Sequence, residues 1–180
     1  GALTKDDLKQ IQEMKYVKSA EGKLSVTATT DHDKTLLLNF IDSNQISKFY
    51  VYDGEGFDSN KSGAWLDNFY AIEQGIEVGD TITIKYDGFT LKEKVLGLIN
   101  VPDHLYDTRD ESELYPDRSE FGFCYVSIHE IPEDYIQSMI MKEAGITDVN
   151  MFSYLFPNFQ YLDYIPYNSI MVDVSDLSKR

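Results

Sequence analysis

The sequence has one cysteine, few basic residues and no long apolar run. A single cysteine, Cys124, excludes an intramolecular disulfide. Its place in the run Phe-Gly-Phe-Cys-Tyr-Val predicts a buried, inert thiol on a strand. No apolar stretch approaches the ~18 residues of a membrane-spanning helix, and the longest, Leu36 to Ile41, is interrupted by Asn39. We therefore expect this stretch of chain to be soluble by itself.

Basic residues are scarce relative to acidic ones. There are 16 Lys and Arg against 31 Asp and Glu, which gives a formal net charge of −15 at pH 7. Nucleic-acid binding needs clustered Lys and Arg, and anionic membrane surfaces attract basic segments. The sequence therefore argues against a nucleic-acid partner and against docking on an anionic bilayer. Solubility is the simplest explanation of the acidic excess.

Recognisable catalytic and metal-binding motifs are also missing. The three histidines, His32, His104 and His129, lie far apart, and none has a second His or a Cys at ligand spacing. There is no Gly-x-Ser-x-Gly motif. Cys124 and His129 are five residues apart, which on a strand favours opposite faces. Carboxylates are too numerous to single out a glycosidase pair. We expect no cofactor, no bound metal and no catalytic residue.

Aromatic residues, in contrast, are abundant. The 180 residues include 13 tyrosines and 10 phenylalanines, and 42% of the chain is hydrophobic. This content is enough for a packed core, and the length fits one domain or one domain with an insert. Tyrosine tolerates half-burial, so the composition suits an amphipathic sheet or an interface.

The clearest local pattern runs from Asp67 to Asn100. Asp67 is a suitable N-cap, Gly75 a suitable C-terminal cap, and Asp87-Gly88 a strong hairpin signal. The pattern predicts a helix over Asn68–Gln74 and a hairpin of strands Thr81–Tyr86 and Phe89–Ile99. Elsewhere periodicity predicts helices over Lys5–Lys15, from Pro132 to Gly145, and over Thr147–Phe156, with strands over Leu24–Thr29, Thr35–Ile41, Lys48–Tyr52, Ala64–Leu66, Phe121–Ser127 and Asn168–Val174.

Several short patterns also follow one another in a fixed order along most of the chain. They are Ala71, Gly75-Ile76, Val78-Gly79-Asp80, Ile82, Ile84, Val95-Leu96-Gly97, Pro102-Asp103 through Tyr106, Pro116-Asp117, Phe121-Gly122-Phe123, Tyr125-Val126 and Tyr167 through Val172. In this order they resemble the extracytoplasmic domain of MacB/FtsX-type ABC transporter permeases. The resemblance implies an α+β fold like the MacB periplasmic core. Residues 1–48 and 121–180 would form an outer α/β unit, and residues 49–120 a β-rich inserted subdomain.

The resemblance also implies a function. It indicates a non-catalytic extracellular domain at the cell membrane that couples ATP hydrolysis by a separate cytoplasmic ATPase subunit to export or to an extracellular partner. The domain would join the transmembrane helices of the permease and be dimeric in the full transporter. Two alternatives remain open: a free secreted or surface-anchored binding module, and an acidic extracellular hydrolase.

The predicted partner-binding site lies in the acidic stretch Val101–Glu120, which is long for a loop in a compact domain and therefore typical of a functional segment. Its apolar and aromatic members are Leu105, Tyr106, Leu114 and Tyr115. Such a mixture suits a polar-rimmed patch for a basic partner, a cationic peptide or an extracellular protein. The alternative is that these residues fold back on the core as a lid. The family's topology further predicts both chain ends on one side, with the first helix beside the last strand.

Overall fold

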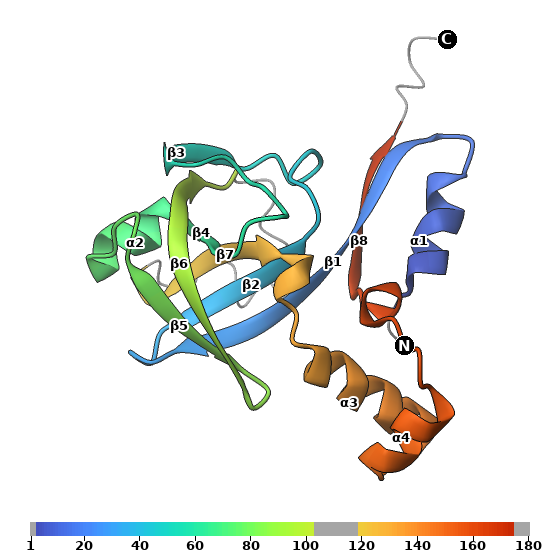
Figure 1. The fold of residues 1–180 in the computed structure, drawn as a ribbon. Helices are drawn as coiled ribbons and strands as arrows, with labels where there is room; N and C mark the ends of the chain where they lie inside the picture. The colour runs from blue at the N-terminus through green and yellow to red at the C-terminus, as the bar shows by residue number, and fades with distance from the viewer. Residues whose placement is uncertain (1–2, 103–118, 175–180) are drawn as a thin grey trace.

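The computed structural model describes residues 3–102 and 119–174, and its path is drawn in Figure 1. The fold is α+β, as expected. Its elements in chain order are α1 (Lys5–Gln12), β1 (Val17–Thr30), β2 (Thr35–Ile41), β3 (Tyr50–Gly54), β4 (Ala64–Asp67), α2 (Asn68–Gln74), β5 (Thr81–Tyr86), β6 (Phe89–Asn100), β7 (Phe121–Ser127), η3 (Ile128–Glu130), α3 (Glu133–Ala144), α4 (Val149–Leu155), η4 (Tyr161–Tyr164) and β8 (Ser169–Val174).

Six strands form a closed ring. The pairing order is β2-β7-β4-β6-β5-β1, and β1 pairs back onto β2. The β2–β7 and β4–β6 pairs are parallel, whereas the other four pairs are antiparallel. Closure removes the unpaired edges that an open sheet would have. We call these six strands the ring.

The ring encloses the larger of two apolar clusters. Side chains alternate along a strand, so Leu24, Val26 and Ala28 of β1 point inward together with Leu36 and Leu38 of β2. A second cluster lies on the opposite face of β2, β4, β6 and β7. Its buried members are Ile41, Phe49, Trp65, Ile99, Phe123 and Tyr125. These strands are thus covered on both faces, which explains why β4 and β7 are nearly continuous hydrophobic runs.

The stretch predicted most sharply from sequence folds as expected. The Asp67 side chain accepts a hydrogen bond from the amide of Phe69, and Gly75 ends α2 with φ of 68°. Asp87 and Gly88 both have positive φ, 48° and 83°. This is the conformation of the tight hairpin turn that joins β5 to β6.

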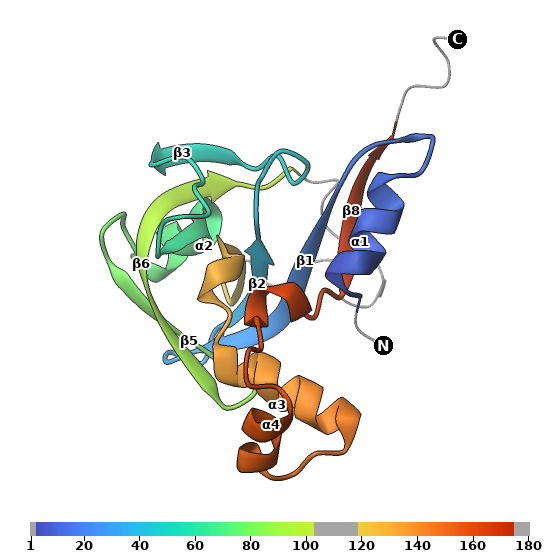
Figure 2. The ribbon, with the colours of Figure 1, turned by 45° about the vertical axis from the view of Figure 1, so that its right-hand side comes forward.

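Strand β1 extends beyond the ring. Its second half pairs with β2, whereas its first half pairs antiparallel with β8, from Val17 opposite Val174 to Lys23 opposite Ser169. Figures 1 and 2 both show α1 beside this two-stranded ribbon. A capping box between Thr4 and Asp7 starts α1. The helix ends at Gln12, three residues earlier than predicted.

Helices α3 and α4 lie next to one end of the ring (Figure 2). Pro132 precedes α3, Glu133 and Asp134 occupy its first turn, and Gly145 ends it with φ of 70°. Asp148 caps α4 by accepting a hydrogen bond from the amide of Asn150 at 2.8 Å. We call β8, the first half of β1, α1, α3, α4 and η4 the outer layer.

Of the two predictions about the chain ends, only the position of the first helix is confirmed. Helix α1 lies beside β8, as predicted. Leu3, however, bridges to Tyr167 just before β8, whereas Val174 ends β8 next to Val17. The two described ends therefore lie at opposite ends of the ribbon rather than together. Both predicted units, residues 49–120 and the flanking segments, contribute strands to the ring. The division into two units stays a prediction.

Candidate functional site

The sequence-predicted partner site lies outside the described residues. Leu105, Tyr106, Leu114 and Tyr115 all fall between residues 103 and 118. The patch and lid alternatives for these four residues therefore stay predictions. The described part of the molecule offers three other candidates: an apolar pocket, a buried carboxyl group and an exposed aromatic surface.

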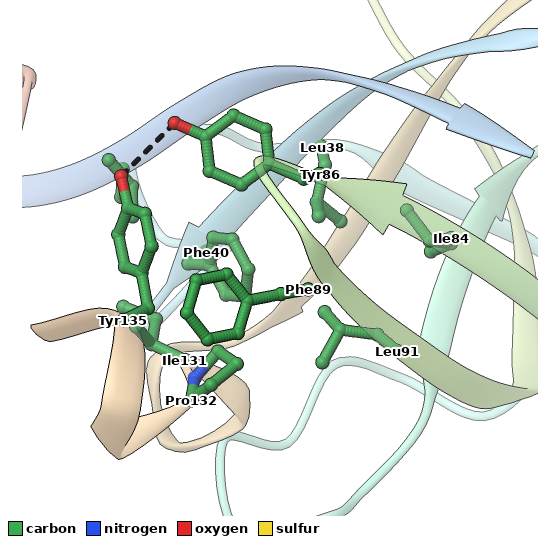
Figure 3. A pocket seen from close by; sticks show the side chains of 10 residues that line it. Leu38, Phe40, Ile84, Tyr86, Phe89, Leu91, Ile131, Pro132 and Tyr135 are labelled. Atoms are coloured by element: carbon green, nitrogen blue, oxygen red, sulfur yellow. Dashed lines mark hydrogen bonds between the residues drawn. The ribbon is translucent and has the colours of Figure 1, made fainter. Parts of the chain in front are cut away.

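The apolar pocket lies at one end of the ring, where the β5–β6 hairpin meets the start of α3 (Figure 3). Tyr86 and Phe89 come from the hairpin, Phe40 from β2, and Pro132 and Tyr135 from the α3 segment. The remaining lining residues are Leu24, Leu38, Ile84, Leu91 and Ile131. The lining is aliphatic and aromatic, and the cavity volume of about 10 Å³ is at the lower limit for a single water molecule, so the pocket is a small gap in the apolar packing.

Two of the residues that line this pocket are tyrosines. The hydroxyls of Tyr86 and Tyr135 lie 3.1 Å apart and are hydrogen-bonded, as the dashed line in Figure 3 marks. The Tyr135 ring also meets Phe89 edge to face, with centroids 5.4 Å apart. Burial, strengthened by the bond to Tyr86, raises the pKa of Tyr135. Tyr135 therefore stays protonated and braces α3 against the hairpin.

A carboxyl group is buried inside the ring. Glu93 follows the inward alternation of β6 after Leu91 and is 3% exposed. The pKa of Glu93 is raised to about 8, mainly by burial, with smaller contributions in the same direction from the charge of Glu130 and a hydrogen bond with it. Glu93 therefore keeps its proton near neutral pH. A perturbed carboxyl marks functional sites in many proteins, which makes Glu93 a candidate.

Cysteine chemistry is blocked by burial. Cys124 of β7 is 0% exposed and lies within the ring cluster. Burial, with the nearby charge of Glu93 adding to it, raises the pKa of this thiol. His129, five residues on, is exposed. The thiol is thus protonated and sealed from water, as the sequence predicts, and the two side chains do not form a nucleophile–base pair.

An aromatic surface covers the outer side of α4 and the following turn. We define the α4 surface as Met151, Tyr154, Leu155, Phe156, Leu162 and Tyr164, all of them exposed. Phe152, in contrast, is buried beneath them. Exposed apolar patches of this kind mark contact sites for other molecules.

Within 3–102 and 119–174, no three or more His, Cys, Asp or Glu side chains gather closely enough to hold a metal ion. Across the described helices, none has the length and apolarity needed to span a bilayer.

Sequence reasoning missed Glu93 and the α4 surface, although each has a sequence signal. Glu93 stands where the alternation of Phe89, Leu91 and Val95 demands an apolar side chain. Residues 149–162 contain no charged residue, in a chain that is 26% charged. Both signals are departures from a local pattern, which a search for catalytic motifs does not register.

Comparison with known proteins gives one informative likeness. The extracellular domain of the noncanonic ABC-type transporter YknZ from Gram-positive bacteria superimposes with a TM-score of 0.56 at 15% identity, covering 99% of this chain and 76% of that one. The periplasmic region of MacB from Actinobacillus actinomycetemcomitans superimposes more loosely, with a TM-score of 0.40 at 11% identity over 88% of this chain and 84% of that one. The YknZ likeness confirms, at the level of the fold, the expected resemblance to an extracellular domain of an ABC-type transporter.

Sequence comparison adds little. No protein-family model matches the chain. Flagellar hook-associated protein 1 of Bacillus subtilis (strain 168) is 24% identical over 108 residues, which are 60% of this chain and 21% of that protein. The matched region thus spans about a fifth of this curated relative, too little to assign a family.

Proposed function

We propose that this chain is the extracellular domain of an ABC transporter permease and that it does no chemistry itself. The observation that carries the proposal is the likeness to the YknZ extracellular domain along 99% of the chain. At 15% identity the likeness supports a shared fold, and a shared fold does not by itself establish function. The transporter role is therefore our inference. The domain would stand outside the cell membrane, joined to membrane helices of the same protein.

The site geometry fits a non-catalytic role. Cys124 is sealed inside the ring, His129 faces solvent, and Tyr135 is held protonated by burial. In the proposed mechanism, a cytoplasmic ATPase subunit hydrolyses ATP and the permease helices pass the motion to this domain. The domain then engages an exported molecule or an extracellular partner. Two copies would face each other in the full transporter.

The loop around Tyr106 and Tyr115 remains a proposed contact for a basic partner such as a cationic peptide. Changing both tyrosines to alanine tests it. If the loop is a contact surface, the melting temperature holds and the intact transporter loses its export or resistance phenotype. A sharp fall in melting temperature would instead assign both residues to the core.

The transporter role is tested with the intact protein that contains this chain. Purified from membranes in detergent, it should bring an ATPase subunit with it, and reconstituted vesicles should hydrolyse ATP. Removing residues 3–174 should leave the subunits associated but abolish the coupled phenotype. A protein that is released from cells without membrane segments and without an ATPase would refute the proposal and favour a secreted binding module.

A further inference from the structure

Except for Tyr164, the α4 surface lies in the longest uncharged stretch of this acidic chain. Residues 149–162 have no Asp, Glu, Lys, Arg or His, yet Tyr154 is 84% exposed and Leu155 is 51% exposed. Protein interfaces are distinguished by this combination of charge depletion and aromatic enrichment at their centre. Tyrosine is also one of the residues that most often dominate binding energy.

Ring contacts and a hydrogen bond to α3 fix several side chains in and beneath the α4 surface. The Phe152 ring packs against Phe156 and Phe159, with centroids 5.2 Å and 5.3 Å away, and Phe159 stacks on Tyr164 at 4.7 Å. The Tyr161 hydroxyl donates a hydrogen bond to Gln137 of α3 at 3.1 Å. These contacts fix the rings before a partner binds. Binding would therefore cost little side-chain entropy in this part of the surface.

A groove and an acidic rim border the surface. The groove runs along α3 and the α3–α4 connection, and its lining includes Met141, Ile146 and Val149. Between residues 133 and 163 the sequence has five carboxylates and one basic residue, Lys142. One of these carboxylates, Asp163, is paired with Lys5 at 3.1 Å. Glu143 and Asp148 are exposed and adjoin the groove residues Lys142 and Thr147 in sequence, and we call these two carboxylates the rim. Even with Lys5 included, the net charge of this segment is negative.

This charge pattern indicates which class of molecule could bind the α4 surface. A second copy of the chain would bring a like-charged rim and another net charge of −15, which disfavours self-association. An anionic bilayer is repelled for the same reason. A helix with an apolar face for the α4 surface and flanking Lys or Arg for the rim satisfies both requirements.

We propose that the α4 surface and the adjoining groove bind a basic amphipathic helix of another protein. The aromatic and aliphatic side chains accept its apolar face, and Glu143 and Asp148 attract its flanking cations. The proposal deepens the proposed function by naming a partner surface, and it rests on that function for the extracellular setting of the partner.

The test uses the full 180-residue chain and a fluorescent amphipathic helix built from leucine and lysine, with a leucine–glutamate helix as the reversed-charge control. Binding is measured by fluorescence anisotropy at low and high salt. The test variant is Tyr154→Ser with Leu155→Ser. The matched control is Tyr50→Ser with Tyr52→Ser on β3, since these tyrosines are 67% and 69% exposed on another part of the molecule.

We expect the lysine helix to bind, the glutamate helix not to bind, and salt to weaken the complex. The Tyr154/Leu155 variant should lose about tenfold or more in affinity, as for central interface residues, and the β3 control should change less than about twofold. The charge reversal Glu143→Lys should weaken binding of the lysine helix independently. Circular dichroism confirms that each variant is folded.

Three results would overturn the proposal. One is equal loss in the β3 control and the α4 variant, which would show that binding is not specific to the α4 surface. Another is α4-dependent binding of the chain to phosphatidylcholine vesicles with no binding of the lysine helix, which would assign the surface to lipid. The third is α4-dependent dimerisation in sedimentation. Because the isolated chain is used, each of these leaves the transporter role to its own test with the ATPase.

Discussion

The ring and the outer layer use similar residues in opposite ways. In the ring, strands such as β4 and β7 are buried on both faces, and Trp65 is fully enclosed. In the outer layer, α4 buries Phe152 and presents its other large side chains to solvent. Apolar composition alone therefore does not distinguish core from contact surface. What distinguishes them is whether a neighbouring strand or helix covers the second face.

The comparison assigns different tasks to the two regions. Burial of apolar surface is the main source of stability, so the ring should determine the free energy of unfolding. Exposed, pre-organised side chains contribute little to folding and remain available for binding. Each of the following changes separates these two contributions.

The largest expected effect follows loss of the ring's tryptophan. Trp65 packs against Phe57 at 4.7 Å and donates its indole N–H to the carbonyl of Glu55 at 2.9 Å. Trp65→Ala removes this packing and leaves a cavity, so we expect a loss of about 3–5 kcal/mol in the free energy of unfolding. Urea denaturation followed by circular dichroism measures it. A loss no greater than that of Tyr52→Ala, on exposed β3, would contradict the assigned role of the ring.

The next effect is a pH dependence from Glu93. In the folded chain burial raises its pKa from 4.5 to about 8, with Glu130 acting in the same direction. Between these values the folded chain keeps a proton that the unfolded chain has released. The free energy of unfolding therefore falls as pH rises through this window, by at most about 1.4 kcal/mol per pH unit. The stability associated with protonated Glu93 is fully present below its unfolded pKa of 4.5 and is lost once the pH exceeds about 8.

The variant Glu93→Gln sharpens this prediction, since glutamine stays neutral. Denaturation midpoints between pH 5.5 and 8.5 should become flatter, and at pH 8.5 the variant should be more stable than the parent chain. Glu77→Gln, at an exposed carboxylate before β5, serves as the control and should keep the parent's slope. Identical pH profiles for Glu93→Gln and the parent would show that the buried carboxyl is not what titrates.

A smaller and local effect should follow a change in the ribbon. A Cβ on Gly22 would lie 2.7 Å from the Cγ and Cδ1 atoms of the buried Tyr167 ring. Gly22→Ala should therefore cost about 1–3 kcal/mol by overpacking. Hydrogen exchange should quicken at the amides of β8 while those of β6 stay protected. The control is Gly56→Ala, where a Cβ meets nothing within 4 Å. Faster exchange throughout β6 would mean that ribbon and ring unfold as one unit.

The smallest effect is expected on the α4 surface. Tyr154→Ala removes a ring that is mostly in solvent, so the free energy of unfolding should stay within about 0.5 kcal/mol of the parent. Phe152→Ala, two residues away and buried, is the matched contrast and should cost several times more. Thermal melts of both variants give the comparison. A large loss from Tyr154→Ala would place this residue in a packed core and remove the basis for a contact surface.

Local structure was largely predictable from the sequence. The helix after Asp67 and both strands around Asp87-Gly88 fall at the predicted residues, apart from one residue at Asn100, because caps and turns are local signals. Where such signals were weak, boundaries shifted. Helix α1 has no glycine after it and ends at Gln12 instead of Lys15, and β3 starts at Tyr50 instead of Lys48.

Ring closure was not predictable in the same way. It depends on β1 pairing with β5 at Thr29 and Thr30, residues far from their partners in sequence. Alternation tells which face of a strand is apolar but not which strand lies next to it. The buried position of Glu93 follows from closure, because an open sheet would leave one face accessible to water.

Strand β1 has a consequence for the order of folding. Its second half pairs with β2 across the short turn at Thr30–Lys34, whereas its first half must wait for β8 near the end of the described chain. Local pairings form early and distant ones late, because closing a long loop costs more entropy. One strand thus contains a fast and a slow contact. In the interval its first half is an uncovered edge, and Lys18, Glu21 and Lys23 are the kind of charged residues that keep such an edge from joining a neighbouring chain.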